Sequence, residues 1–140
     1  MTVSPQAELF VSSRELKWAP FSEGIWLKLL RLSPETGSWT ILLKCAAGSS
    51  FARHRHLGAG EYFMLSGRMD VRGGAAAGGV TAVAGDYGWE PVSVIHDSTC
   101  FPEPSEFIVT NHGAVQFLDE DDTTVFVLDW EAIAALAAAA

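Results

Sequence analysis

Short segments in which apolar and polar residues alternate recur along most of the chain, and a period of two is typical of β-strands. The first clear pair is Ile25 to Leu32 and Thr40 to Ala46, joined by a turn that contains Pro34 and Gly37. The same pattern and its turn residues predict further strands at Phe51 to His56, Glu61 to Ser66, Arg68 to Arg72, Thr81 to Ala84, Tyr87 to Glu90, Val94 to His96, Glu106 to Asn111, Ala114 to Leu118 and Thr123 to Leu128.

Strands at this spacing, with no amphipathic helix before Asp129, predict an all-β fold that is either closed or built from two antiparallel sheets. The 140 residues suit one domain. Residues 130–140 are rich in alanine and predict a short C-terminal helix capped by Asp129. Residues 1–23 predict an irregular arm with one short strand near Leu9 to Val11, of the kind that crosses to a partner subunit. Gly73 to Gly79 predicts a flexible loop.

Composition and charge exclude several classes of function. The formal net charge of -8 opposes binding to nucleic acid or to an anionic membrane, because both need a basic surface. The N-terminus lacks the pattern of a secretory signal, and the apolar run from Ala132 to Ala140 is too short to span a bilayer. Cys45 and Cys100 form no CxxC motif, so we expect reduced thiols and a cytoplasmic protein.

Three of the four histidines lie in segments predicted to be strands. His54 and His56 are two residues apart, so in a strand they share one face, with about 7 Å between them along the chain. Such a pair is also common without a ligand, but His96 follows at the end of another predicted strand. Three imidazoles suit a divalent first-row metal, so His54, His56 and His96 are the predicted metal ligands.

The two histidine segments resemble the two motifs of the cupin family, whose members are small β-barrels of the jelly-roll type. In the first motif, Gly48 is followed by five residues, His54-Arg55-His56, four residues and Glu61, and Gly67 then arrives one residue early. The second motif is matched by Gly85, Pro91 and His96, with Ser93 where glycine is usual and Cys100 where asparagine is usual. The resemblance implies a cupin jelly-roll β-barrel, extending over residues 25–128.

Within the cupins, the chain resembles the acetylacetone-cleaving enzymes, which are iron(II) dioxygenases with three histidine ligands and no carboxylate ligand. The segments His-Arg-His-Leu-Gly, Gly-Asp-Tyr and Glu-Pro carry this resemblance. It implies an Fe(II) cofactor, a small dicarbonyl substrate, O2 and a homodimer or homotetramer. It also implies a surrounding shell at Phe51, Tyr62, Arg72, Glu90, Thr99 and Phe107. Val109 and Asn111 replace larger apolar residues of the family, so we expect a cavity of different shape.

The two glutamates near the motifs leave alternatives open. Glu61 could be a fourth ligand, or a carboxylate at the sheet edge, because a slip of one residue turns a side chain to the other face. Glu90 could remove the central proton of the substrate, with Arg72 as its ionic partner and Tyr62 or Thr99 as hydrogen-bond partners. The alternative for Glu90 and Arg72 is a purely structural ion pair.

Other side chains have simpler interpretations. Phe51 and Phe107 are predicted to line the substrate pocket, whereas most other aromatic residues are expected to be core. His112 follows Asn111 in a predicted turn and is expected at the surface. The acidic run from Asp119 to Asp122 lacks the ligand spacing of a calcium loop.

Three functions are compatible with these residues. The leading hypothesis is a mononuclear non-haem Fe(II) dioxygenase that cleaves a carbon–carbon bond of a small β-diketone. The second is a non-catalytic zinc-binding cupin, similar to the sensor half of zinc anti-sigma factors. The third is a cupin whose metal assists isomerisation or hydrolysis without dioxygen. Histidine ligands also accept Zn, Ni and other divalent metals, so residue types alone do not select the metal.

Overall fold

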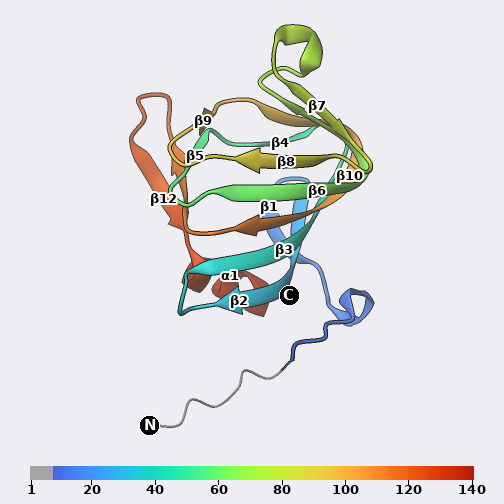
Figure 1. Ribbon diagram of the computed structural model, residues 1–140, viewed down its shortest axis with the longest axis vertical. Coiled ribbons are helices and arrows are strands. Elements are labelled where there is room, and N and C mark those ends of the chain that lie inside the picture. The colour runs from blue at the N-terminus through green and yellow to red at the C-terminus, as the bar shows by residue number, and fades with distance from the viewer. Residues whose placement is uncertain (1–7) are drawn as a thin grey trace.

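About half of the residues lie in antiparallel strands, which form two sheets (Figure 1). The computed structural model describes residues 8–140. The first sheet contains eight strands, namely β1 (Ala19–Ser22), β2 (Ile25–Ser33), β3 (Ser38–Cys45), β4 (Ser49–Phe51), β6 (Gly60–Val71), β7 (Val80–Val83), β8 (Tyr87–Glu90) and β10 (Thr99–Asn111). The second sheet contains four strands, namely β5 (His54–His56), β9 (Ile95–His96), β11 (Val115–Leu118) and β12 (Thr124–Leu128).

Strands that are distant in sequence pair in both sheets, as in a jelly roll. The first sheet has the order β1-β2-β3-β10-β6-β7, with β4 also beside β10 and β8 also beside β6, and the second has the order β12-β11-β5-β9. Among residues 8–140 the two sheets are not joined into a closed barrel. The expected closure of the strands into a barrel is therefore wrong. The all-β jelly-roll prediction itself is confirmed.

The predicted strand from Phe51 to His56 is interrupted, and this break brings the histidines into the second sheet. β4 ends at Phe51 in the first sheet, and β5 begins at His54 after Ala52 and Arg53. A strand that changes sheets in this way forms a corner of a sandwich. The histidines of β5 therefore point inward between the two sheets instead of lying on one continuous sheet.

Two strands, β6 and β10, continue through positions where the sequence predicted a break between strands. β6 continues through Gly67, which has φ +80°, and β10 begins at Thr99 and continues through the segment with Pro102 and Pro104. The pairing of β6 with β10 is irregular here, and the Ser105 hydroxyl accepts a hydrogen bond from the Arg68 amide at 2.9 Å. Proline and left-handed glycine are tolerated in strands at such irregularities, because the regular ladder is already interrupted.

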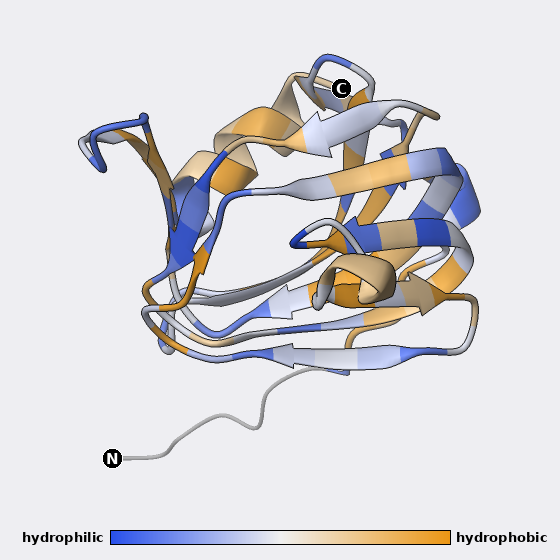
Figure 2. Ribbon diagram, turned by 90° about the horizontal axis from the view of Figure 1, so that it is seen from above, coloured by the Kyte–Doolittle hydropathy of each residue, from blue (hydrophilic) through white to orange (hydrophobic). Residues whose placement is uncertain are grey.

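The core lies between the sheets, and side chains alternate between core and solvent along each strand. In β6, Tyr62 and Met64 are buried whereas Phe63 and Leu65 are about half exposed. Figure 2 shows this alternation as orange and blue segments along the strands. Trp39 and Phe101 are the largest side chains that are almost completely buried.

The chain ends in helix α1 (Trp130–Ala138), as predicted apart from its last two residues. Asp129 caps the helix, since its Oδ1 accepts a hydrogen bond from the Ala132 amide at 2.8 Å. Ile133 is completely buried, and the helix packs against β1, β2 and β12. No helix among residues 8–140 has the length and apolar character needed to cross a membrane.

The described part of the N-terminal arm packs on the first sheet of its own chain. Residues 8–12 form no strand, so the short strand predicted near Leu9 to Val11 is absent. Lys28 Nζ donates to the Ser13 carbonyl at 2.7 Å, and the Lys28 and Lys44 ammonium groups lie 4.5 and 4.6 Å from the centroid of the Trp18 ring. Residues 19–22 of the predicted arm form β1, and residues 1–7 lie outside the described part.

Candidate metal centre

Three buried histidine rings converge on the inward face of the neighbouring strands β5 and β9. Alternation places His54 and His56 on the same face of β5, and the β5–β9 register sets His54 opposite His96. The ring centroids are 5.4 Å apart for His54 and His56, 5.3 Å for His54 and His96, and 5.5 Å for His56 and His96. The structure therefore brings together the three side chains that the spacing singled out.

Glu90, the last residue of β8, completes the cluster. Its Oε2 lies 2.6 Å from His96 Nδ1 and 3.3 Å from His56 Nε2. One ligand atom from each of His54, His56, Glu90 and His96 lies within 4.8 Å of all the others. These four side chains form a metal-binding site in which the carboxylate lies directly beside the imidazoles.

The tautomer of His54 is set by the backbone. His54 Nδ1 is 2.7 Å from the Ala52 carbonyl oxygen, which can only accept, so Nδ1 carries the hydrogen and Nε2 keeps its lone pair. The pKa of His54 is lowered to about 4, mainly by burial and to a smaller extent by the neighbouring His56 and His96, against the opposing effect of the Ala52 bond. A neutral imidazole with a free Nε2 is the form that binds a metal.

His56 provides a direct test of whether a metal fits. Its Nδ1 lies 3.1 Å from Asn111 Oδ1, whereas its buried Nε2 makes no hydrogen bond to any residue in 8–140, although Glu90 Oε2 is 3.3 Å away. A buried nitrogen without a hydrogen-bond partner is costly unless it binds an ion or water. The orphaned Nε2, aimed at a cluster of histidine and carboxylate donors, is what a metal site requires.

Glu90 is held in its ionised form. Burial by itself would raise the pKa of Glu90, but its contacts with His56 and His96 outweigh this effect and bring the pKa down to about 2. The carboxylate is therefore negative at neutral pH. It offsets the positive charge that a divalent cation would bring into this buried site.

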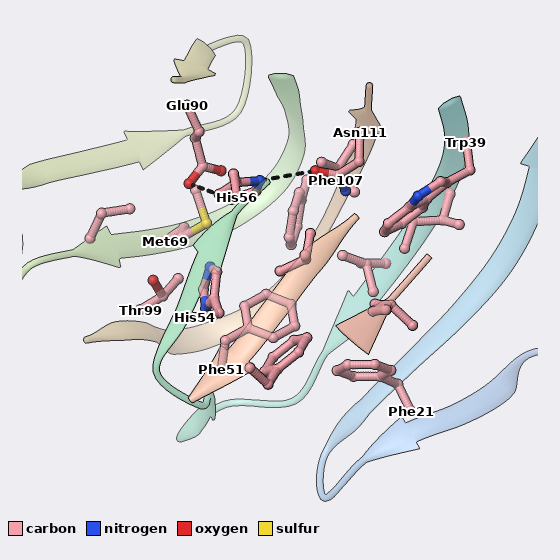
Figure 3. Close-up of a pocket in the computed structure, with 17 residues that line it drawn as sticks. Phe21, Trp39, Phe51, His54, His56, Met69, Glu90, Thr99, Phe107 and Asn111 are labelled. Atoms are coloured by element: carbon pink, nitrogen blue, oxygen red, sulfur yellow. Dashed lines mark hydrogen bonds and ion pairs between the residues drawn. The ribbon is translucent and has the colours of Figure 1, made fainter. Parts of the chain in front are cut away.

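An apolar cavity of about 70 Å³ adjoins the cluster and lies between the two sheets (Figure 3). Phe51 and Phe107 both line it. Thr99 lines it too, and its buried Oγ1 has no hydrogen-bond partner among residues 8–140. The remaining walls are Phe21, Trp39, Ile41, Leu43, Met69, Val71, Val109, Asn111, Val115, Phe117 and Leu128.

The expected ion pair between Arg72 and Glu90 is not formed in the described part of the chain. Arg72 is exposed, with φ +52°, and its guanidinium donates to the Ile95 carbonyl at 3.5 Å. β6 ends at Val71, so the left-handed backbone of Arg72 takes this residue out of the strand alternation. The groups beside the Glu90 carboxylate are therefore imidazoles and not a guanidinium, with His96 Nδ1 at 2.6 Å from Oε2.

Tyr62 lies on the other side of Glu90. Its buried ring packs against Gly88, where an added Cβ would lie 2.2 Å from Tyr62 Cζ, and no hydrogen bond joins it to Glu90 among residues 8–140. Burial, followed by the charge of Glu90, raises the pKa of Tyr62. Tyr62, Arg72, Glu90 and His96 line a second pocket of about 260 Å³, so Glu90 lies in the wall between the two spaces.

Glu61 is not a fourth ligand. It alternates with the inward Tyr62 and therefore points outward, where its carboxylate accepts from the Tyr87 hydroxyl at 2.5 Å and lies 3.0 Å from His112 Nε2. His112 is half-exposed, as predicted, but it has this unexpected partner. At Glu61, β6 pairs with both β10 and β8, so this residue is an outward carboxylate inside the first sheet and the expectation of a sheet-edge position is also wrong.

The contact of Asn111 with His56 is not apparent from the sequence, in which Asn111 indicates only a change in the cavity wall. The two residues are 55 positions apart, and their contact depends on the pairing of β10 with β6, which places Asn111 opposite Gly60. The only available signal was an asparagine that follows Phe107 and Val109 at alternate positions, on the inward face of β10.

Comparisons with known proteins agree with this geometry. Residues 6–116 match the ChrR cupin-like domain family. A curated acetylacetone-cleaving enzyme from Acinetobacter johnsonii is 43% identical over 129 residues, which cover 89% of this chain and 84% of that enzyme.

Two crystal structures extend the likeness to the fold. A candidate acetylacetone dioxygenase from Methylibium petroleiphilum has a TM-score of 0.92 and 46% identity, with 100% of this chain and 99% of the other covered. An acetylacetone dioxygenase from Acinetobacter johnsonii has a TM-score of 0.88 and 38% identity, with 99% and 95% covered.

Proposed function

The chain belongs to the ChrR-like cupin family and is a relative of acetylacetone-cleaving enzymes, and from this premise we propose that it is a dioxygenase that cleaves a carbon–carbon bond of a small β-diketone. The observation that carries the proposal is the convergence of three buried imidazoles and one carboxylate beside an apolar cavity. A metal centre open to such a cavity suits a small substrate and O2 better than it suits a purely structural ion.

We propose iron(II) as the metal, held by His54, His56 and His96. The fit is supported by the neutral His54, by the burial of all three rings and by the Nε2 of His56, which has no hydrogen-bond partner in the described part of the chain. Bound there, iron(II) would supply a Lewis acid for the substrate oxygens and a source of electrons for dioxygen.

Glu90 is the proposed proton acceptor. A β-diketone carries an acidic proton on its central carbon, and an ionised carboxylate beside the cavity can take it. The lowered pKa of Glu90 keeps this group ionised at neutral pH. Tyr62, packed beside it, would help to position the carboxylate.

The remaining polar and aromatic residues of the cavity bind and enclose the substrate. Thr99 offers an unused hydroxyl to the substrate, and Phe51 and Phe107 exclude water from it. A cavity of about 70 Å³ would admit only a small diketone. We therefore propose a compact β-diketone such as acetylacetone as the substrate.

The direct test is oxygen consumption by protein reconstituted with Fe(II) in the presence of acetylacetone. We expect one O2 consumed for each diketone cleaved, with a carboxylic acid and a dicarbonyl as products. Protein reconstituted with Zn(II) serves as the control and should consume none. Absence of oxygen uptake by fully iron-loaded protein would refute the proposal, and diketone loss without oxygen uptake would indicate hydrolysis.

Substitutions separate metal binding from turnover. We expect His96→Ala to lose bound metal and Glu90→Gln to keep it while turnover falls by about 10²-fold or more, the usual effect of losing a general base. Glu61→Gln removes an outward carboxylate and is the matched control that should change neither property. Metal loss in Glu90→Gln would instead identify Glu90 as a fourth ligand.

A second candidate function is a non-catalytic zinc-binding cupin, which the match to the ChrR cupin-like domain favours. The same four side chains would then hold zinc, and the protein would consume no oxygen with any β-diketone. Metal analysis of protein purified from iron-supplemented cells distinguishes this candidate, since it predicts zinc as the bound metal.

We also propose that the protein associates into a homodimer or homotetramer. The outer faces of β6 and β8 expose four neighbouring large side chains, Phe63, Leu65, Tyr87 and Trp89. Adjacent exposed apolar side chains of this size mark many subunit interfaces. Light scattering on the wild-type protein and on Trp89→Ser tests this. We expect the variant to dissociate at a higher protein concentration than the wild type does.

We propose a cytoplasmic location. Cys45 and Cys100 are both free, one buried and one exposed, which is typical of proteins from reducing compartments. Fractionation of cells that express a tagged chain would test the location.

A further inference from the structure

Asn111, the last residue of β10, touches the metal site without belonging to it. Its side chain is almost completely buried, and its Oδ1 lies 3.1 Å from Nδ1 of His56, as the dashed line in Figure 3 shows. Asn111 also lines the apolar cavity. It is therefore a polar side chain placed where the cavity walls are otherwise mostly hydrocarbon.

The chemistry of this contact determines which nitrogen of His56 carries the hydrogen. An amide oxygen accepts hydrogen bonds and cannot donate, so His56 Nδ1 must be protonated. The lone pair is then on the buried Nε2, which makes no hydrogen bond within residues 8–140 and lies 3.3 Å from Glu90 Oε2. His54 obtains the same tautomer from the Ala52 carbonyl, which any residue at position 52 would supply. His56 depends on a side chain that a substitution can remove.

The neighbouring strand leaves room for this contact. Asn111 pairs with Gly60 across β10 and β6. A Cβ on Gly60 would lie 2.7 Å from Asn111 Oδ1 and 2.9 Å from His56 Cε1, closer than real Cβ atoms approach other atoms. Gly60 is not among the left-handed glycines, so space is the reason for glycine here. An added methyl group would push the two partners apart without removing either.

We infer that Asn111 is a positioning residue, which holds His56 in the tautomer and ring orientation required for metal binding. The inference rests on the proposed metal site, and its tests use metal affinity and tautomer, neither of which depends on turnover. Outer hydrogen bonds of this kind to a ligating histidine typically contribute 10- to 100-fold to metal affinity.

The first experiment measures the Zn(II) dissociation constant by competition with a chromogenic chelator. We expect Asn111→Leu, which keeps the volume but removes the acceptor, to weaken binding about 10- to 100-fold. Asn111→Asp keeps an acceptor at the same place and should restore most of the affinity. Val109→Ala changes the same face of β10 and the same cavity but removes no hydrogen-bond partner of a histidine, and should leave Zn(II) affinity unchanged.

The second experiment observes the tautomer directly, by long-range proton–nitrogen NMR of metal-free protein labelled with 15N-histidine. We expect the wild-type His56 to carry its hydrogen on Nδ1. In Asn111→Leu and in Gly60→Ala we expect a mixture of tautomers, because the acceptor has been removed or displaced. A purely structural role would leave the tautomer of folded variants unchanged.

Two results would overturn the inference. One is a folded Asn111→Leu that binds Zn(II) as tightly as the wild type. The other is His56 with its hydrogen on Nε2 in the metal-free wild type, a result that needs no variant to fold. If the iron-loaded wild type consumes no oxygen while Asn111→Leu still shows weaker Zn(II) binding and a mixture of tautomers, the proposed function fails and this inference stands.

Discussion

Acid should destabilise the metal-free protein through His54 more than through an ordinary histidine. Burial lowers the pKa of His54 from 6.5 to about 4 in the folded state, whereas the unfolded chain returns it to its usual value. Between these two values the unfolded state binds a proton that the folded state does not. The stabilisation from keeping His54 neutral is therefore complete above pH 6.5 and is lost as the pH falls toward 4.

The size of the effect follows from the two pKa values. At about 1.4 kcal/mol for each pKa unit, the fall from 6.5 to about 4 corresponds to about 3 kcal/mol of unfolding free energy. A domain of this size typically has a total stability of about 5 to 15 kcal/mol, so the loss is a large share. Bound metal should increase the pH dependence, because protons and metal compete for the same nitrogen.

The assay is urea unfolding of metal-free protein at several pH values between 7 and 4. His54→Asn removes the titrating group, so its stability should fall by about 3 kcal/mol less than that of the wild type over this range. His112→Asn removes an exposed histidine and should follow the wild type. An equal loss in His54→Asn and wild type would refute the reasoning, as would an NMR titration of His54 with a midpoint near 6.5.

Other predictions follow from single contacts. Asp129→Ala should lower the unfolding free energy by about 1 kcal/mol, since it removes the cap of α1, whereas Asp129→Asn should retain most of it in urea titrations. Burial raises the pKa of Cys45 to about 12, so a thiol reagent at pH 8 should modify only Cys100 in the native protein. In urea it should modify both cysteines. Rapid modification of both cysteines in the native protein would contradict the burial of Cys45. Gly88→Ala should cost about 1 to 3 kcal/mol by overpacking against Tyr62, and Tyr62→Ala in the same chain should recover part of that loss, as a double-mutant cycle would show.

Much of the fold and the histidine ligands could be predicted from short-range pattern. Alternation along a strand depends only on backbone geometry, so it indicated the strands and showed that His54 and His56 share a face. The helix cap at Asp129 is equally local, since it joins residues three positions apart. These features need no knowledge of which strands pair.

Features that depend on partners across the sheets were not predictable in the same way. Glu90 and Arg72 are both polar residues near a strand end, but only the backbone at the end of β6 shows that Arg72 turns away while the histidines receive Glu90. The break before β5 and the contact of Asn111 with His56 likewise follow from the pairing of distant segments.

The sequence by itself therefore determined which residues alternate, cap and cluster within one strand or turn, because these relations are set by the covalent geometry of neighbouring residues. Only the tertiary structure decided which carboxylate joins the imidazoles, which side chain orients His56 and how the sheets enclose the cavity. Those choices depend on register between strands far apart in the chain, where a slip of one residue exchanges the inward and outward faces.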